Sequence, residues 1–168
     1  MIDPLIDILL EQIHEKLTNA KRTWSEQIVE NQSVEPTLDM MRQSDEWKRE
    51  FLNKRRIKLE RGHKGLVKSL VDIDQLMREL LQILPEPNSP TFLTWDEFTS
   101  PIIENLNSAD EVLEINIYPS IQNFKTRGFP YNYPFEVQDV EEHLLNALLG
   151  VEHLKVVLIN WKRYHGST

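Results

Sequence analysis

The sequence predicts an all-α protein, an antiparallel bundle of about four long helices with a mixed insertion before the last helix. Glycine is scarce, with five residues among 168. Apolar residues recur with the 3.6-residue period of a helix along four long stretches, and clusters of proline, which end helices, lie between stretches. We expect one domain over residues 1–168, with residues 89–136 as an irregular insertion.

The first helix is expected over residues 3–30. Its apolar residues fall on one face at 100° per residue, and Pro4 stands near the start, where a helix tolerates proline. The face comprises Ile2, Leu5, Ile6, Leu9, Ile13, Leu17, Ala20 and Trp24. Residues 33–36 break the pattern.

A second helix is expected from Thr37 through a strongly basic window, Lys48 to Lys68. Its apolar face is thin, so we expect it to be exposed or to project beyond the bundle. Gly62 and Gly65 interrupt the run, and they indicate either a turn between two helices or a close crossing within one long helix. We favour a break or kink, because glycine is a poor helix former. A cleaner apolar stripe then continues to Leu84, where prolines end the third helix.

Residues 89–136 differ from the rest of the chain. The pattern Thr94-Trp-Asp-Glu97 is a capping box that predicts a short helix to about Asn105, and Ser108 suggests a second start. Residues 112–117 fit either the end of that helix or a short strand, since periodicity does not separate the two over so few residues.

A loop with four aromatic residues and two prolines follows over residues 129–135. It has two interpretations. The rings can close one end of the bundle, or they can present Tyr131 and Tyr133 as rigid anchors for a partner, since aromatic side chains are frequent interface hot spots.

The last helix, about residues 138–164, is apolar over most of its circumference. A helix of this kind is normally buried among others. We therefore expect it to be the central element of the bundle.

The basic window is the main functional clue. Nine bases and two acids give it a charge of +7 in a chain whose net charge is −8, so the remainder carries −15. The bases are Lys48, Arg49, Lys54, Arg55, Arg56, Lys58, Arg61, Lys64 and Lys68. On a helical wheel they point in all directions, which disfavours one flat docking stripe.

Three acid-before-base pairs at i,i+4, Asp45–Arg49, Glu50–Lys54 and Glu60–Lys64, favour a solvated helix. The bases left over require an acidic neighbour: another part of the chain, a partner protein or second copy, or a nucleic acid or anionic membrane. The residues predicted to make the contact are Lys54, Arg55, Arg56, Lys58 and Arg61, together with Tyr131 and Tyr133.

Metal chemistry is suggested only by two Glu-x-x-His pairs, Glu11…His14 and Glu60…His63. They resemble the ligand pairs of carboxylate-bridged di-iron bundles. The helical wheel turns Glu11 and His14 away from the apolar face, and one pair does not complete such a site. We therefore expect no metal and no cofactor.

Arg56 and His63 are separated by six residues. This spacing resembles the loose Arg-x(4–6)-His pattern of the helical HEPN ribonucleases, in which the pair lies near a helix end. The resemblance covers eight residues and would imply RNA cleavage by Arg56 and His63. No other catalytic or nucleotide-binding motif accompanies it.

Composition and the N-terminal sequence exclude several further classes of protein. Cysteine is absent, which excludes disulfide scaffolds, thiolate metal sites and cysteine catalysis. The N-terminus lacks the basic region of a signal peptide, and no uninterrupted apolar run approaches the ~20 residues of a membrane span. We expect a cytoplasmic protein. Nucleic acid is not expected as a partner, because the chain is acidic overall and Phe51 is the window's one ring for stacking.

The predicted function is a non-enzymatic protein-interaction module that docks through the basic helix and the aromatic loop, onto a protein partner or onto a second copy in a homodimer. The alternative is an enzyme, either a HEPN-like ribonuclease or a carboxylate-bound metal protein.

Overall fold

The structure is a computed structural model that describes residues 3–31, 37–85, 94–123 and 137–165, and every element in these ranges is helical. This confirms the all-α fold class. The long helices are α1 (Leu5–Thr23), α3 (Asp45–Ile83), α4 (Asp96–Val112) and α6 (Val137–His165). The short elements are the π-helix η1 (Trp24–Ile28), the 3₁₀-helix η2 (Val29–Asn31), α2 (Leu38–Met41), the π-helix η3 (Leu113–Ile117) and α5 (Tyr118–Asn123).

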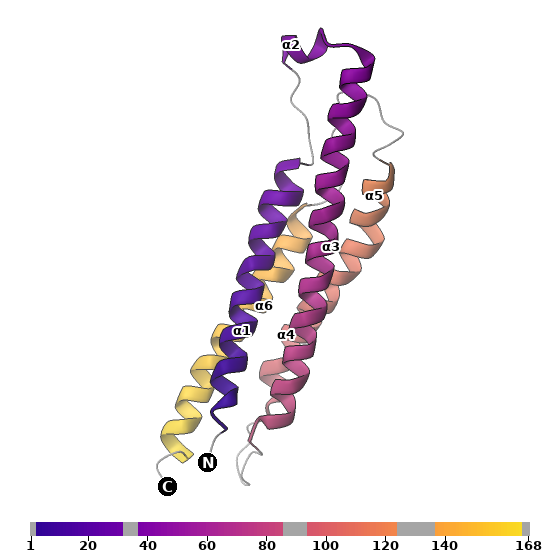
Figure 1. Cartoon of the computed structure of the whole chain (residues 1–168). Helices are drawn as coiled ribbons and strands as arrows, with labels where there is room; N and C mark the ends of the chain where they lie inside the picture. The colour runs from indigo at the N-terminus through magenta and orange to yellow at the C-terminus, as the bar shows by residue number, and fades with distance from the viewer. Residues whose placement is uncertain (1–2, 32–36, 86–93, 124–136, 166–168) are drawn as a thin grey trace.

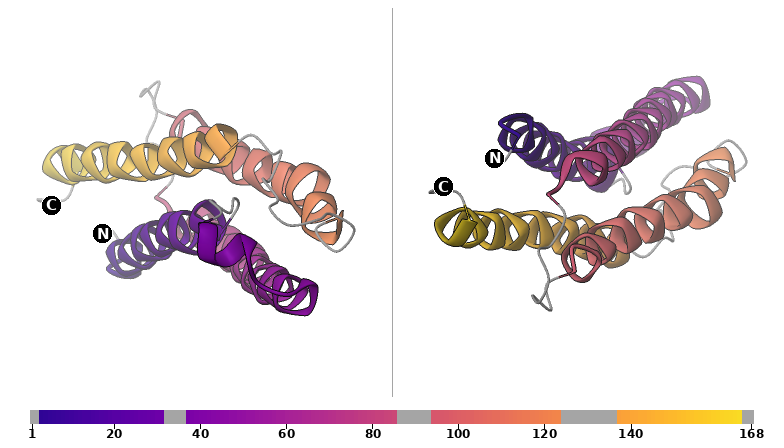
Figure 2. Two further views of the ribbon diagram at one scale, coloured as in Figure 1. Left: turned by 90° about the horizontal axis from the view of Figure 1, so that it is seen from above. Right: turned by 90° about the horizontal axis from the view of Figure 1, so that it is seen from below.

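The helices form two packed layers. One layer pairs α3 with α1, which η1 and η2 extend; the other pairs α6 with the rod formed by α4, η3 and α5 (Figure 1). Seen along the bundle, the two layers lie against each other, and α1 packs on α6 as well as on α3 (Figure 2). The start of α1 and the end of α6 lie at the same end of the bundle, whereas α3 projects past η2 at the other end, where α2 lies.

The core between the layers is continuous and mostly aliphatic. From α1 and η1 it receives the predicted face, from Ile6 to Trp24, and also Ile28. From α3 it receives Leu59, Leu66, Ile73, Met77 and Leu80, which are fully buried. This spacing of three, four or seven residues is what places them on one face of a helix.

α3 is one helix of 39 residues, so the predicted break at Gly62 and Gly65 is wrong. Each glycine weakens a helix by about 1 kcal/mol relative to alanine, but the buried leucines on both sides hold the helix together. Gly62 also has a packing reason: a Cβ at this position would lie 2.7 Å from the Cβ of Gln27 and 3.0 Å from Cδ1 of Ile28. The missing side chain therefore lets η1 approach α3 closely.

The insertion predicted over residues 89–136 is regular where the structure describes it. Residues 96–123 form an unbroken helical rod, with no break near Asn105 and no strand over residues 112–117. Residues 113–117 are π-helical, and their buried members Leu113 and Ile117 continue the apolar face of α4. Burial of this face against the rest of the protein therefore favours a helix over residues 112–117, where the local sequence pattern fitted either a helix or a strand.

α6 packs against α4 and α1, but it is not the central element that its composition predicts. Its outer face is open to solvent, with Leu145, Leu149, Val156 and Ile159 between 40% and 54% exposed. By length and composition alone, Val140–Arg163 could cross a membrane. This possibility was not predicted from the sequence, because charged residues interrupt the apolar run. A buried core helix can have the same composition, but only 28% of the apolar window of this helix is buried.

Candidate functional site

A strongly basic surface lies on the outer face of α3. Five bases there are exposed and follow one another at spacings of three and four residues, opposite the buried leucines. They are Lys54, Lys58, Arg61, Lys64 and Lys68, which we call the basic stripe. Because an α-helix rises 1.5 Å per residue, the stripe is about 21 Å long.

No carboxylate of the described residues lies within ion-pair distance of the basic stripe. Four neighbouring pairs of like charge stand at i,i+3 or i,i+4 along it, beginning with Lys54–Lys58. Each such pair destabilises an isolated helix by about 0.2–0.5 kcal/mol. The stripe therefore carries a repulsion that an acidic partner would relieve.

Two of the predicted contact residues, Arg55 and Arg56, have structural roles instead. Arg56 is only 15% exposed, donates to Oε1 of Glu60 at 2.7 Å, and reaches Oδ1 of Asn53 at 2.7 Å. Arg55 is partly buried, and its guanidinium lies 5.1 Å from the centre of the Phe51 ring. Burial lowers the pKa of Arg55.

Arg55 and Arg56 are thus engaged within the chain, five outward-facing bases form the stripe, and Arg49 is exposed outside it. The nine bases do point in different directions, as expected, but five of them line up along one exposed side of α3, which the wheel of all nine did not reveal. Of the five predicted bases, the structure leaves Lys54, Lys58 and Arg61 exposed on the stripe and adds Lys64 and Lys68. The expected pair Glu60–Lys64 is replaced by Glu60–Arg56.

Sequence reasoning left Lys64 out because it paired this base with Glu60, whereas the structure pairs Glu60 with Arg56. It also did not separate the bases on the exposed side of the helix, Lys68 among them, from those that face the bundle. On a helical wheel centred on the buried Leu59 and Leu66, all five bases of the stripe fall on the opposite, exposed side of the helix.

Gly65 lies within the basic stripe and is exposed. A Cβ built there would have no atom within 4 Å, so no contact within the described structure requires a glycine. The position forms a smooth site between Arg61 and Lys68, where the backbone of a bound partner could approach closely.

The surface next to α3 has the opposite charge. Residues 94–123 contain six acids and no Lys or Arg, and this rod packs alongside α3. Three of its exposed acids, Glu97, Glu104 and Glu111, repeat every seven residues. A negative ligand on the basic stripe would therefore have an acidic neighbour.

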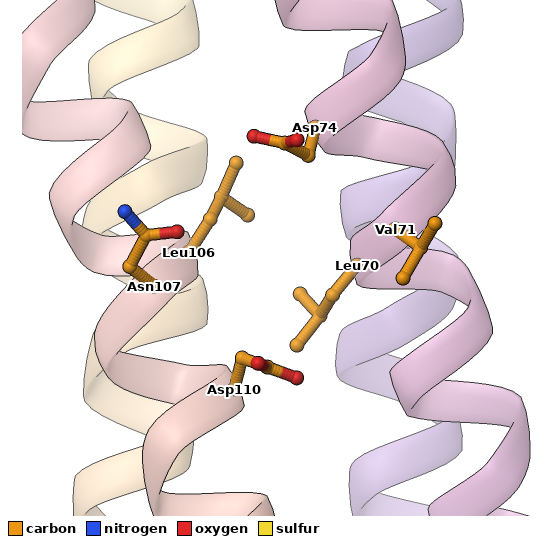
Figure 3. A pocket seen from close by; sticks show the side chains of 6 residues that line it. All are labelled: Leu70, Val71, Asp74, Leu106, Asn107 and Asp110. Carbon is orange, nitrogen blue, oxygen red and sulfur yellow. The ribbon is translucent and has the colours of Figure 1, made fainter.

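Between α3 and α4 lies a shallow pocket of about 150 Å³. Figure 3 shows Asp74 from α3 and Asp110 from α4 at its rim, with Leu70 and Leu106 between them. Asp74 forms an ion pair with Arg78 at 2.9 Å. The pocket is smaller than the roughly 300–1,000 Å³ usual for small-molecule sites, and its two carboxylates do not form a ligand cage.

The predicted ribonuclease pair does not form an exposed site. His63 is 5% exposed, and its Nε2 lies 3.1 Å from the carbonyl oxygen of Leu113. Arg56 is held by Glu60 one turn away. The Glu-x-x-His residues are likewise separated, since Glu11 binds Lys155 and His14 contacts Glu152. In the ranges that the structure describes, no three His, Asp or Glu side chains are arranged to hold a metal ion.

Tyr131 and Tyr133, the predicted aromatic anchors, lie outside the described residues.

Comparison of the chain with protein families, with curated proteins and with solved structures finds no significant match.

Proposed function

We propose that this protein is a non-enzymatic interaction module that binds an acidic protein surface along the basic stripe of α3. The observation that carries the proposal is the row of five exposed bases, none of them neutralised by a described residue. Charges arranged in this way steer an oppositely charged partner and raise its association rate.

The geometry favours an acidic helix as the partner. Lys54, Arg61 and Lys68 repeat every seven residues, so they lie about 10 Å apart along one line. A helix with acids at the same interval could place a carboxylate opposite each base. Gly65, in the middle, leaves room for that helix to approach α3 closely.

A protein partner is favoured over nucleic acid for two reasons. The stripe has no aromatic side chain on which a base could stack, and Phe51 is engaged with Trp47 and Arg55. The acidic rod beside α3 would also repel a phosphate backbone, whereas a protein can present acids to α3 and other groups to the rod.

A second copy of the chain is one partner with the required chemistry. Glu97, Glu104 and Glu111 on α4 have the same seven-residue interval as Lys54, Arg61 and Lys68. An association of this kind depends on charge, so about 1 M salt should abolish it through screening.

The class of partner is tested with defined probes. At about 150 mM salt, the purified chain should bind a fluorescent helical peptide with glutamate at every seventh position, and should not retain a single-stranded RNA or a DNA duplex of equal charge. Reversal of Lys54, Lys58 and Arg61 to glutamate should abolish peptide binding. Preferential binding of either nucleic acid would contradict the proposal.

A further inference from the structure

A second surface, on the opposite layer of the bundle, has a different character. α6 presents Leu145, Leu149, Val156 and Ile159 to solvent, each at least 40% exposed. Their spacing of four, seven and three residues keeps them on one side of the helix, outside the contacts with α4 and α1. We call these four residues the α6 stripe.

Polar contacts to α1 border the α6 stripe on one side, and one of them, at Glu152, lies within the stripe. Lys162 binds Asp7 at 2.8 Å, Lys155 binds Glu11 at 2.9 Å, and His14 lies 3.5 Å from Glu152. These contacts fix the rotation of α6 about its axis, so the stripe faces outward. An exposed row of large apolar residues with a charged border is typical of a protein interface.

The order of residues along α6 is complementary to itself when reversed. Glu142 and Leu145 precede Leu149, and Val156 is followed by Ile159 and Arg163. If a second α6 runs antiparallel about a two-fold axis near Glu152, Leu149 lies opposite Val156, and Leu145 opposite Ile159.

The charges at the two ends agree with the same arrangement. The antiparallel pairing brings Glu142 opposite Arg163 of the other copy at both ends of the seam. Both residues are exposed, and neither has an ion-pair partner among the described residues. A parallel pairing would instead place Glu142 against Glu142 and Arg163 against Arg163.

We infer that the α6 stripe is the interface of a symmetric homodimer in which two α6 helices pack antiparallel. Such an interface is isologous, since each copy contributes the same surface. It is separate from the basic stripe and does not depend on the function proposed for α3. Burial of apolar surface drives it, so it should persist at about 1 M salt.

Glu152 is the one interruption of the apolar seam, and it lies at the two-fold axis. The two Glu152 carboxylates would face each other there, each with its own His14 beside it. Replacement Glu152→Leu removes this repulsion and extends the apolar seam. It should tighten the dimer about tenfold or more.

The first test is sedimentation equilibrium of the full chain and of Glu152→Leu, Leu149→Gln and Val156→Gln. Leu149→Gln and Val156→Gln should each weaken the dimer at least about tenfold while the helical circular dichroism is unchanged. Val71→Gln is the matched control, because Val71 is 62% exposed on α3, and it should leave the dimer unaltered. A chain that stays monomeric at high concentration even as Glu152→Leu would overturn the inference.

Disulfide trapping tests whether the two α6 helices pack antiparallel. Because the chain has no cysteine, each disulfide must form at the introduced residues. Glu152→Cys should form a disulfide-linked dimer under mild oxidation, whereas Glu142→Cys alone should not, since the two copies of residue 142 would be about 30 Å apart. A mixture of Glu142→Cys and Arg163→Cys proteins should give the mixed dimer. Efficient cross-linking of Glu142→Cys to itself would indicate a parallel pairing and contradict the arrangement.

A lipid surface is the other occupant that an apolar helix face could have. Flotation with neutral phosphatidylcholine vesicles separates the two cases. The inferred dimer should remain with the protein fraction. Vesicle binding that Leu149→Gln abolishes, in a chain that is monomeric without lipid, would assign the stripe to a membrane and overturn the dimer.

Discussion

The imidazole of His63 on α3 lies with Nε2 3.1 Å from the carbonyl oxygen of Leu113, fifty residues further along the chain. A carbonyl oxygen can only accept, so Nε2 must carry the proton. The same oxygen accepts from the backbone N–H of Tyr118 across the π-helical turn, and the His63 ring packs on the Tyr118 ring at 5.3 Å. His63 therefore joins α3 to the α4–η3–α5 rod as a structural residue.

Replacement His63→Ala should destabilise the protein by about 1–3 kcal/mol, because it removes a buried hydrogen bond and leaves space in the core. Urea unfolding followed by circular dichroism measures this change. Gln75→Ala is the control, since Gln75 is exposed on the same helix, and it should alter stability by no more than about 0.5 kcal/mol. Equal stability of wild type and His63→Ala would contradict the structural role.

Gly62 and Gly65 should respond oppositely to the same substitution. Gly65→Ala adds a methyl group in open space and should stabilise the protein by about 0.5–1 kcal/mol, since alanine is the better helix former. Gly62→Ala places a Cβ against that of Gln27 and should destabilise it by about 1–3 kcal/mol through overpacking.

Thermal and urea unfolding of the two glycine variants measure the difference. Stabilisation by both alanines would mean that η1 does not pack closely on α3.

The ion pair between Glu11 and Lys155 makes a testable electrostatic prediction. The hydrogen bond from Lys155, followed by its charge, holds the pKa of Glu11 below the ordinary value of 4.5. The ion pair thus favours the folded state above this pH, and the contribution is lost as the pH falls through the lowered pKa of the folded protein. It should be small because Glu11 is exposed.

NMR titration of the Glu11 carboxyl carbon checks this prediction. Lys155→Met should return the pKa of Glu11 toward 4.5. The control is Lys16→Met, which removes a lysine of α1 that pairs with Asp72 and should leave the pKa of Glu11 unchanged. An identical titration of Glu11 in wild type and Lys155→Met would contradict the ion pair between α1 and α6.

The fold class and the long apolar faces could be predicted because they depend on periodicity alone. The predicted face of the first helix is buried from Ile6 to Trp24, whereas Leu5 at its start is 42% exposed. The break at Gly62 could not be judged from the sequence, because the preference of glycine for helix ends competes with a contact to Gln27 that only the tertiary structure reveals.

The same limit applies to α6 and to the basic window. A helix that is apolar nearly all round, such as α6, is expected to be buried. Its sequence does not say whether the same chain or a second protein buries it. Likewise, the sequence shows nine bases in the window. Whether a base such as Arg56 forms contacts within the chain, or one such as Lys58 is exposed, depends on which side of α3 packs against the other helices.

The central claim is that the basic stripe binds an acidic protein partner, and affinity capture from native cell lysate tests it most directly. Wild type is compared with two triple variants of equal charge change. One reverses Lys54, Lys58 and Arg61 to glutamate; the matched control reverses Arg22, Arg42 and Arg49, which are exposed outside the stripe.

The proposal predicts an acidic protein that wild type and the control variant retain and the stripe variant loses. That protein, once purified, should bind wild type less tightly as salt rises. Retention of the same proteins by all three chains, or equal losses from both variants, would contradict a specific role for the basic stripe.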